Sequence, residues 1–514
     1  MREDAELEVG GFLARLVAPE PGYVLVRFVL LRLLGVVYLT AFLVAAFQLV
    51  PLIGERGVLP ASDQIRDLTL HEGSSLGAFR RLPSIFLLTG ASDTALSVVA
   101  WTGVVLSALV ALGMTNSIVM FILWALYLSI SQIGQIFYGY GWEIQLLETG
   151  ILAVFLCPWR SVGPFSGAAP PVFAIWMQRW LIARVMLGAG LIKLRGDACW
   201  RDLTCLVYHY ETQPIPGPLS PALHAMPVWF QKIGVVFNHL VEVVAPFFAF
   251  WPMQARRVAG TLFVVFQATL ILSGNLSFLN WLTIVPAIAC FDDRLLARLL
   301  PDALVRAAER TAPRATRASL AASGAWGLVV ALLSVQPVAN LLSPSQAMNR
   351  SFDPLHLVNT YGAFGSVGRT RYEVILSGTN AEIPDDSAEW LEYELPCKPG
   401  DVARRPCWIT PYHLRLDWQM WFLQFSEAEQ NRWFMSLVSE ILAGDDPARG
   451  LWARDPFPTT PPRWLKADVY VYRYAQEGPA TWQRSWERTY MRPLEREDPE
   501  LLRILDAWGL PRRR

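Results

Sequence analysis

The chain has 514 residues, of which 53% are hydrophobic and only 17% are charged, and its mean hydropathy is +0.31. A soluble protein of this length needs far more polar surface, so the composition excludes an ordinary soluble protein and indicates a membrane protein. The 44 basic and 44 acidic residues give a net charge of zero, so no overall field favours nucleic acid as a partner.

Apolar stretches recur along the first two thirds of the chain. A bilayer core of roughly 30 Å requires about 20 apolar residues per helix. The first stretch lacks a small-residue cleavage site and is too long for a signal-peptide core, so we expect an uncleaved anchor. The sequence predicts a bundle of about nine transmembrane helices in residues 1–342. The stretches are 33–53, 95–113, 117–137, 142–158, 172–194, 230–251, 257–273, 276–291 and 324–342.

The basic residues between these stretches indicate how the bundle crosses the membrane. Loop 292–322 is rich in arginine, so the positive-inside rule places it in the cytoplasm. Counting outward puts the N-terminus, with Arg2 and Arg15, on the same side. Loops 54–94 and 195–229 and the tail after residue 342 then fall on the extracytoplasmic side. Loop 54–94 also contains arginines, but its length and its acidic residues weaken that contrary indication.

Four cysteines fall on the expected extracytoplasmic side, where disulfides persist. Cys199 and Cys205 form one short-spaced pair, and Cys397 and Cys407 form another. We predict the disulfides Cys199–Cys205 and Cys397–Cys407. A zinc site is the weaker alternative, because the sequence has no C-x-x-C motif. In another alternative, Cys199 or Cys205 stays reduced for thiol exchange with a partner protein.

The tail after residue 342 is more polar and has mixed patterning. A capping-box pattern, Ser426 followed by Glu429, predicts an amphipathic helix through about residue 443, and residues 499–509 predict a closing helix. The expected fold class is therefore mainly α: a transmembrane helical bundle followed by an extracytoplasmic α+β domain over residues 343–514. Strand composition with partial alternation marks 371–378, 390–397 and 467–474.

Ionisable residues inside the apolar stretches are costly to bury, so they are candidates for function. The candidates are Lys193, Glu148, His239 and Glu242. The two glutamates with His239 fit either a metal or acid–base site or an interhelical hydrogen-bonded cluster. The second is favoured, because no E-x-x-H or H-E-x-x-H motif is present. Lys193 is either a catalytic base or the partner of a carboxylate such as Glu143. These patterns assign no catalytic residue, cofactor or metal.

Four arginines lie near the expected inner ends of their helices: Arg27, Arg32, Arg179 and Arg184. Long basic side chains in such positions often extend along the helix until the charged group reaches the headgroup region. We therefore expect these arginines to snorkel toward the membrane surface and to have no role in a site.

Loop 195–229 combines charge, aromatic residues and prolines. We expect Lys193 and Arg195 to anchor the preceding helix at the headgroup level, and Gly196 with Asp197 to end it. Four prolines stiffen the second half of the loop. A rigid surface suited to docking, or to a lid over the bundle, is the expected role. The candidate functional residues of this loop are Trp200, Arg201, Asp202, His209, Tyr210 and Glu211.

Long strings of the sequence, read together, resemble one known family, the lipase maturation factors. Four of these strings lie in the helical part: YGYGWEIQLLETG (138–150), GAGLIKLRGDACWRDLTCLVYHYETQPIPGPLSP (188–221), FNHLVEVVAPF (237–247) and SGNLSFLNWLTIVPAIACFDD (273–293). Two more lie in the tail: NTYGAFGSVGRTRYEVILSGT (359–379) and CKPGDVARRPCWITPYHLRLDWQMWF (397–422).

The resemblance implies a multi-pass, chaperone-like factor that helps secreted lipases fold and assemble, with a lumenal tail in the endoplasmic reticulum. Arginine greatly outnumbers lysine, a bias typical of GC-rich, often bacterial, genomes, and a bacterial member would lie in the inner membrane with a periplasmic tail. The expected partners are membrane lipids, a lipase-like client and, in a homo-oligomer, a second copy. A more distant similarity to vitamin K-dependent carboxylase implies the alternative, an intramembrane enzyme acting on a lipid- or quinone-like substrate with Lys193 as base.

Overall fold

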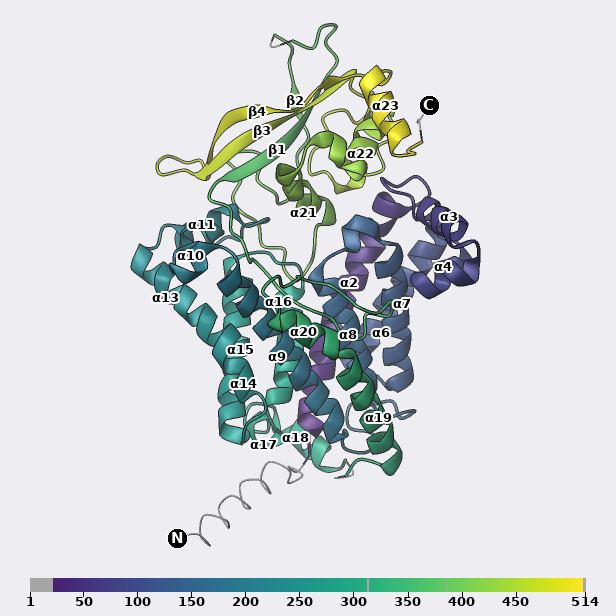
Figure 1. Ribbon diagram of the computed structural model, residues 1–514, viewed down its shortest axis with the longest axis vertical. Helices are drawn as coiled ribbons and strands as arrows, with labels where there is room; N and C mark the ends of the chain where they lie inside the picture. Colours follow the sequence, from purple (N-terminus) through teal and green to yellow (C-terminus); the bar gives the residue numbers. More distant parts are fainter. Residues whose placement is uncertain (1–21, 312–313, 386, 512–514) are drawn as a thin grey trace.

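The computed structural model describes residues 22–311, 314–385 and 387–511. A tall bundle of helices forms one part of the molecule, and a smaller part with a β-sheet is stacked on one end of it (Figure 1). The fold is thus mainly α, with a membrane-type helical bundle followed by an α+β domain. The N-terminal Arg2 and Arg15 lie outside the described residues.

Each expected apolar stretch is helical. Six of the helical segments are long and apolar enough to cross a membrane among the described residues, and two shorter apolar helices accompany them. The bundle helices are α2 (Val24–Ile53), α6 (Asp93–Leu112), α7 (Ser117–Ile133), α8 (Gly141–Val154), α9 (Val172–Arg195), α13 (Val228–His239), α14 (Ala245–Phe248), α15 (Met253–Ser273), α16 (Leu279–Ala287), α19 (Arg317–Leu333) and α20 (Val335–Leu342).

Small residues set how closely the bundle helices approach one another. A Cβ on Gly35 of α2 would lie 2.6 Å from the backbone nitrogen of Ala111 in α6, and one on Gly103 of α6 would meet the ring of Phe42. Helices in a membrane gain from such close van der Waals packing, because lipid tails are as apolar as leucine side chains. Any larger residue at these two glycines would force α2 and α6 apart.

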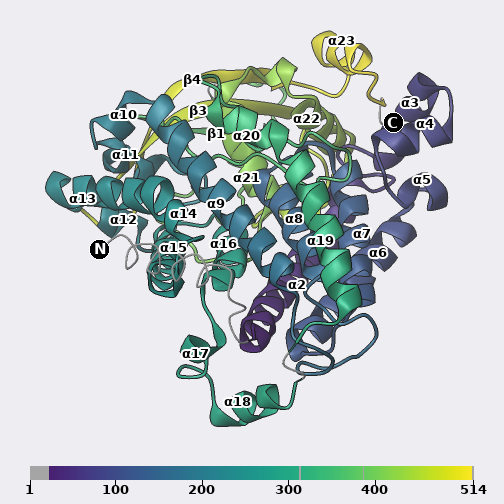
Figure 2. The same cartoon turned by 60° about the horizontal axis from the view of Figure 1, so that its bottom comes forward.

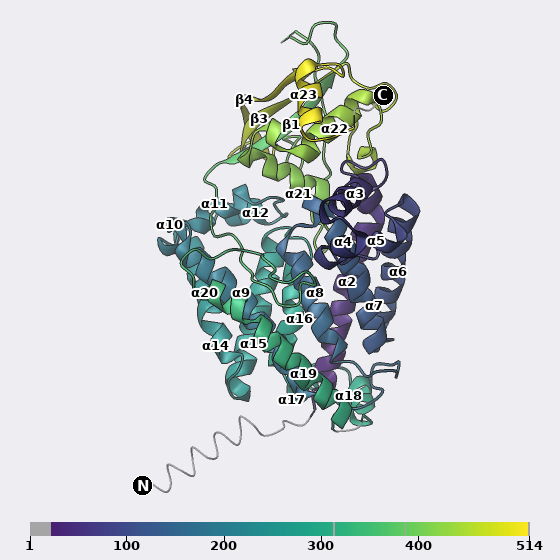
Figure 3. The same cartoon turned by 45° about the vertical axis from the view of Figure 1, so that its right-hand side comes forward.

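Short helices cap the two ends of the bundle. Loop 54–94 forms α3 (Ala61–Glu72), α4 (Ser75–Arg81) and α5 (Phe86–Thr89), and loop 195–229 forms α10 (Ala198–Arg201), α11 (Cys205–Thr212) and α12 (Ser220–His224). Both sets lie at the end that carries the sheet domain (Figures 1 and 3). The arginine-rich segment forms α17 (Asp293–Leu296) and α18 (Asp302–Glu309) at the opposite end, which Figure 2 brings forward. The arginines and the tail therefore lie at opposite ends of the bundle.

The tail domain is built on a four-stranded antiparallel sheet of order β2-β1-β3-β4. Its strands are β1 (Arg371–Thr379), β2 (Leu391–Glu392), β3 (Trp464–Tyr474) and β4 (Trp482–Leu494). The expected strand 390–397 shrinks to two paired residues. β4 was not expected, because exposed polar residues fill most of its first half and hide any apolar alternation.

Three helices accompany the sheet: α21 (Arg415–Phe422), α22 (Arg432–Ala443) and α23 (Pro499–Ala507). The expected capping box is wrong, since α22 begins six residues after Ser426. A 3-10 turn, Ala428–Gln430, comes first, and the Ser426 hydroxyl accepts a hydrogen bond from the side chain of Asn431, at 2.8 Å. Tertiary context thus overrides the local pattern.

The segment between α20 and β1 runs back over the bundle before the sheet begins. A Cβ on Gly188 of α9 would lie 2.2 Å from the carbonyl oxygen of Tyr361, and one on Gly141 of α8 would lie 2.5 Å from Oδ1 of Asn349. These glycines allow the segment to lie directly on α8 and α9. The sheet domain is thereby tied to the bundle from its first residues.

Arg306 of α18 and Ser485 of β4 are exposed at opposite ends of the molecule, so they test the membrane orientation. Each position is replaced by cysteine in a separate variant, and the variants are placed in sealed vesicles of known sidedness. Arg306→Cys is expected to react with an impermeant maleimide only from the cytoplasmic side. Ser485→Cys is expected to react only from the other side. The native Cys157 and Cys290 are buried, so the unsubstituted protein is the blank. Labelling of Arg306→Cys from the extracytoplasmic side would show that the orientation is the reverse of the predicted one.

Candidate functional site

A cavity of about 590 Å³ lies where the bundle meets the tail domain. Its walls come from α8, α9, α13, α15 and α16 of the bundle, from α11, from segment 348–366 and from α21 of the tail. Most of the lining side chains are apolar or aromatic, and the others include amides, hydroxyls and the ionisable Lys193, His209 and Glu242. Small-molecule sites in proteins typically have this composition and a volume of roughly 300–1,000 Å³.

Lys193 reaches this cavity from the last turn of α9, and it is buried. Its Nζ lies 2.5 and 2.7 Å from the two carboxylate oxygens of Glu242 and 3.2 Å from Oδ1 of Asn238. The amide of Asn238 also donates to Glu242, at 2.9 Å. Lys193 is therefore held in an ion pair with Glu242, and the expected pairing with Glu143 is wrong.

A change in helix geometry directs Glu242 toward Lys193. Residues Leu240–Val244 form a π-helix between α13 and α14. Pro246 lies four residues after Glu242 and lacks the N–H that would bond the carbonyl of Glu242 in an α-helix. Such π-bulges are frequent at functional sites, because they redirect one side chain without ending the helix.

Glu148 belongs to a separate network. Its carboxylate is paired with Arg184 and accepts hydrogen bonds from the backbone N–H of Asn359, at 3.0 Å, and from the hydroxyl of Tyr361, at 2.7 Å. Nε2 of His239 lies 3.0 Å from the carbonyl oxygen of Trp200. The expected grouping of Glu148, His239 and Glu242 is therefore wrong. Within the described residues, no three His, Cys, Asp or Glu side chains gather as a metal site would require.

Glu143 pairs with an arginine of the tail. Arg415, the first residue of α21, places Nη1 2.9 Å from Oε1 of Glu143, and both side chains are fully buried. Trp142 donates to the same carboxylate, at 2.9 Å, and the hydroxyl of Tyr127 donates to its other oxygen. The guanidinium also lies 3.3 Å from the ring centroid of Tyr138. This ion pair joins the tail domain to the interior of the bundle.

Three of the arginines expected to snorkel are instead buried in the bundle. Arg184 pairs with Glu148, as described above. Arg27 donates to the carbonyl of Ala168, at 2.8 Å, and Arg179 donates to the carbonyl of Ala289, also at 2.8 Å. Arg32 is half-buried. Carbonyls at helix ends and in loops have no intrahelical donor, so they satisfy these guanidinium groups within the protein.

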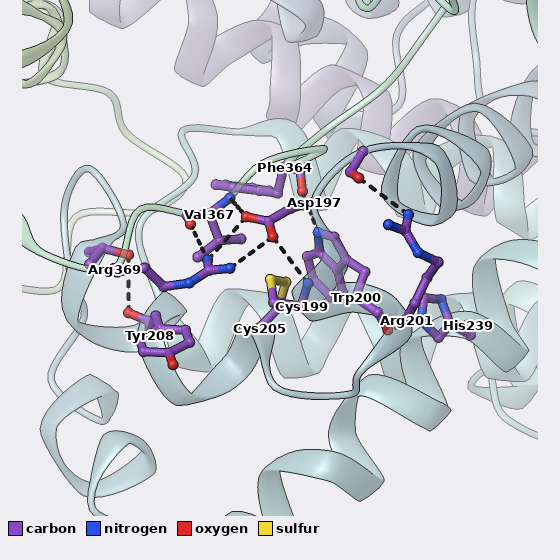
Figure 4. The surroundings of a disulfide bond; sticks show 12 residues. Asp197, Cys199, Trp200, Arg201, Cys205, Tyr208, His239, Phe364, Val367 and Arg369 are labelled. Atoms are coloured by element: carbon purple, nitrogen blue, oxygen red, sulfur yellow. Dashed lines mark hydrogen bonds and ion pairs between the residues drawn. A yellow bond between two sulfur atoms is a disulfide. The ribbon is translucent and has the colours of Figure 1, made fainter. Parts of the chain in front are cut away.

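Loop 195–229 contains the disulfide Cys199–Cys205, one of the two predicted pairs; the second, Cys397–Cys407, is in the tail. Asp197 caps α10 by accepting from the N–H of Cys199, and it pairs with Arg369 of the tail at 2.8 Å (Figure 4). The hydrogen bond from Arg369 lowers the pKa of Asp197 to about 2. The loop is therefore attached to the tail by charge as well as closed by the disulfide.

Most of the candidate residues in this loop are buried under the tail rather than presented to a partner. Trp200 donates to the carbonyl of Phe364, at 2.7 Å, and Glu211 pairs with Arg473 of β3, at 2.8 Å (Figure 4 for Trp200). His209, in α11 beyond the bundle, is buried, which lowers its pKa to about 4 and keeps it neutral. Trp200, His209 and Tyr210 line the cavity, whereas Arg201 and Asp202 are exposed. The loop forms part of the cavity wall.

Sequence reasoning missed a buried charge cluster inside the sheet. Arg371 and Glu373 of β1 pair with each other, and Glu373 also pairs with Lys398. Arg371 further donates to the carbonyls of Glu211, Gln213 and Pro214 in the loop below, at 2.5–3.0 Å. In the sequence, Arg371 and Glu373 are opposite charges at alternate positions of an otherwise apolar strand, and this pattern could have indicated the cluster.

Two family models match this chain. The lipase maturation factor transmembrane domain matches residues 25–298, and the lipase maturation factor C-terminal domain matches residues 357–494. The chain belongs to the lipase maturation factor family. The first match runs from α2 to α17 of the bundle, and the second runs from the segment before β1 to the end of β4, so α19 and α20 lie outside both.

Curated relatives match nearly the whole chain. Lipase maturation factor 1 of Bos taurus is 47% identical over 505 residues, which are 92% of this chain and 90% of the relative. The Homo sapiens protein of that name is 44% identical and covers 95% and 91%. Lipase maturation factor 2 of Homo sapiens is 28% identical and covers 94% and 84%. No solved structure matches this chain significantly.

Loss of one partner of the buried ion pair between Glu143 and Arg415 is expected to destabilise the protein. Arg415→Met leaves the buried Glu143 carboxylate without its countercharge, so the free energy of unfolding is expected to fall by roughly 3–5 kcal/mol. The double variant Arg415→Met/Glu143→Met should recover most of this loss, because both charges are removed. Denaturation in detergent, followed by tryptophan fluorescence, measures both values.

Arg488 and Glu427 provide the matched control, since they form an exposed pair at 3.5 Å. Arg488→Met is expected to change the free energy of unfolding by less than about 1 kcal/mol. An equally small effect of Arg415→Met would contradict the role assigned to the buried pair.

Proposed function

We propose that this protein is a non-catalytic, chaperone-like platform for immature exported lipases, which contact its extracytoplasmic tail. The observation that carries the proposal is an exposed edge strand on a domain anchored rigidly in the bundle. Its membrane is the endoplasmic reticulum membrane in a eukaryotic cell and the inner membrane in a bacterium. The names of the relatives support the link to lipase maturation.

The rigid attachment rests on contacts at several depths. Arg415 of the tail pairs with Glu143 inside the bundle, and Asn359 and Tyr361 bind Glu148. Arg371 binds three carbonyls of loop 195–229. A domain held by buried charge-assisted hydrogen bonds loses little entropy when a client binds, and this favours a docking platform.

β4 is the edge strand of the sheet and is the proposed contact. Residues 483–487 are all exposed, and Trp486 exposes 59% of its surface. An edge strand carries unpaired backbone N–H and C=O groups, which accept an extended segment of another chain. An exposed tryptophan adds apolar contact at low conformational cost. An incompletely folded lipase offers unpaired strands of the kind that such an edge binds.

The burial of the ionisable groups supports a non-catalytic role. Lys193, Glu148 and Glu143 each meet an opposite charge inside the protein. A general base must accept a proton from a substrate, and an ammonium group held by both oxygens of a carboxylate has no free lone pair.

Co-expression of this protein with a secreted lipase, in a system that contains sealed secretory membranes, tests the contact between β4 and the lipase. A photo-crosslinking amino acid in place of Trp486 is expected to capture the newly made lipase. Trp486→Glu is expected to lower the yield of active secreted lipase several-fold without changing the factor's own abundance. The same two changes at Trp508, which is exposed directly after α23, are the control. Equal crosslinking of the lipase from both positions would contradict the proposal that β4 is the contact.

The enzymatic alternative is favoured by one observation, that Lys193 lines the cavity. The double variant Lys193→Met/Glu242→Met removes both charges of this pair and keeps comparable volume, which is often tolerated in a protein interior. A chaperone-like platform is expected to retain at least about half of its effect on lipase yield, since the stability change is small. If the double variant folds but no longer raises the lipase yield, the result would favour chemistry at Lys193 instead.

A further inference from the structure

Seven exposed arginines lie at the end of the bundle opposite the tail domain, and we call them the basic surface. None of the seven has an acidic side chain within ion-pair distance among the described residues. Figure 2 brings this end forward, with α17 and α18 projecting from it. The seven residues come from the segments around α8, α17, α18 and α19: Arg160, Arg294, Arg298, Arg306, Arg310, Arg314 and Arg317.

Four acidic residues lie in the same part of the chain, but two of them are already bound to the bundle. Asp292 pairs with Arg257, at 2.6 Å, and Asp293 accepts hydrogen bonds from three backbone N–H groups at the start of α2, at 2.8–3.1 Å. Asp302 and Glu309 remain exposed. Seven exposed arginines against two exposed carboxylates leave this surface strongly positive.

Exposed arginines at the tail end of the molecule are arranged differently, because several of them are paired. Arg369, Arg473, Arg484 and Arg492 lie 2.6–2.8 Å from the carboxylates of Asp197, Glu211, Glu392 and Asp498. The positive-inside rule requires only that basic residues are present when the chain inserts into the membrane. Arginines that stay exposed and unpaired in the folded protein are in addition free to bind an anion.

Apolar side chains are exposed directly beside these arginines. Trp159, which precedes Arg160, exposes 65% of its surface, and Leu299, which follows Arg298, exposes 72%. Arg294 lies four residues after the apolar helical segment Leu279–Cys290. Exposed tryptophan and arginine next to apolar helices are typical of the headgroup level of a membrane. The basic surface therefore faces lipid headgroups rather than distant solution.

The chemistry of the side chains indicates the kind of headgroup. The planar guanidinium group of arginine donates two parallel hydrogen bonds to a phosphate, and every basic residue of this surface is an arginine. Clusters of roughly four to eight basic residues beside a membrane-spanning helix are typical of sites for anionic phospholipids. A zwitterionic headgroup gains less, because its own ammonium group is repelled by the same surface.

We propose that the basic surface binds anionic phospholipids in the leaflet at that end of the bundle. Their phosphate groups meet the guanidinium groups, and Trp159 and Leu299 contact the upper parts of their acyl chains. Because the arginines are spread over several segments, they bind a shell of such lipids. This inference does not depend on the proposed function, since it requires no client protein.

The probe is a phosphatidylserine with a photoreactive diazirine near the ester end of one acyl chain. It is added to the full-length protein in phosphatidylcholine nanodiscs, in which both leaflets are alike. A single arginine near an anionic surface contributes about fivefold. The probe is therefore expected to label peptides containing 159–162 and 294–310 at least about fivefold more than a phosphatidylcholine probe with the same chains. Raising NaCl from about 0.05 M to about 0.5 M should remove most of this preference, because salt screens exposed charges.

Variants assign the preference to the arginines. The fourfold variant Arg294→Gln/Arg298→Gln/Arg306→Gln/Arg310→Gln is expected to be labelled equally by the two probes. Should it not insert correctly, Arg306→Gln/Arg310→Gln leaves the arginines nearest the spans in place and should lower the preference at least about twofold.

A control variant removes the same charge from the tail domain. It replaces four exposed arginines by glutamine and should keep the full preference. They are Arg405, Arg454, Arg463 and Arg503. Formation of the Cys397–Cys407 disulfide reports that each variant has folded with its tail on the oxidising side.

Three outcomes would overturn the proposal. Equal labelling of the unsubstituted protein by the two probes would show that the basic surface does not select anionic lipids. A preference that persists in the folded fourfold variant would place the lipid elsewhere. A preference that high salt leaves unchanged would exclude an electrostatic origin.

Discussion

Arg415 extends from the tail domain into the helical bundle and meets Glu143 where neither charge touches water. Each charge alone would be too costly to bury, so each one requires the other. The tail therefore cannot leave the bundle without exposing an unpaired carboxylate in an apolar interior. This constraint makes the bundle and the sheet domain one rigid unit, although the composition of the sequence changes sharply between them.

Other buried charges near the contact between bundle and tail are likewise paired inside the protein. Glu148 is satisfied by Arg184 together with Asn359 and Tyr361 of the segment that precedes the sheet. Lys193 is satisfied by Glu242, which a π-helix directs toward it. Each ionisable group that resembled a catalytic candidate in the sequence thus has a structural partner. The cavity remains where these networks leave an apolar space between α9, α15 and α21.

The sequence alone predicted much of the outline, for reasons that are local. The apolar stretches became helices because a helix satisfies its own backbone in a membrane. The two disulfides followed from the spacing of the cysteines and their expected side of the membrane. β1 and β3 showed an apolar pattern, whereas β4 did not, because much of it faces solvent. The capping box at Ser426 was misleading, since Asn431 binds its hydroxyl.

Partners far apart in the chain lay beyond such reasoning. Lys193 had several carboxylates within plausible reach, and no spacing rule separates Glu143 from Glu242. Trp200 and His209 looked like exported surface, yet the returning tail buries them. By itself the sequence determined the helices, the disulfide pairs and the family, because these follow from apolar periodicity, short spacing and contiguous motifs. Only the tertiary structure decided which charges meet and where the cavity lies, because buried charges find partners by three-dimensional proximity, which one sequence does not encode in any local pattern.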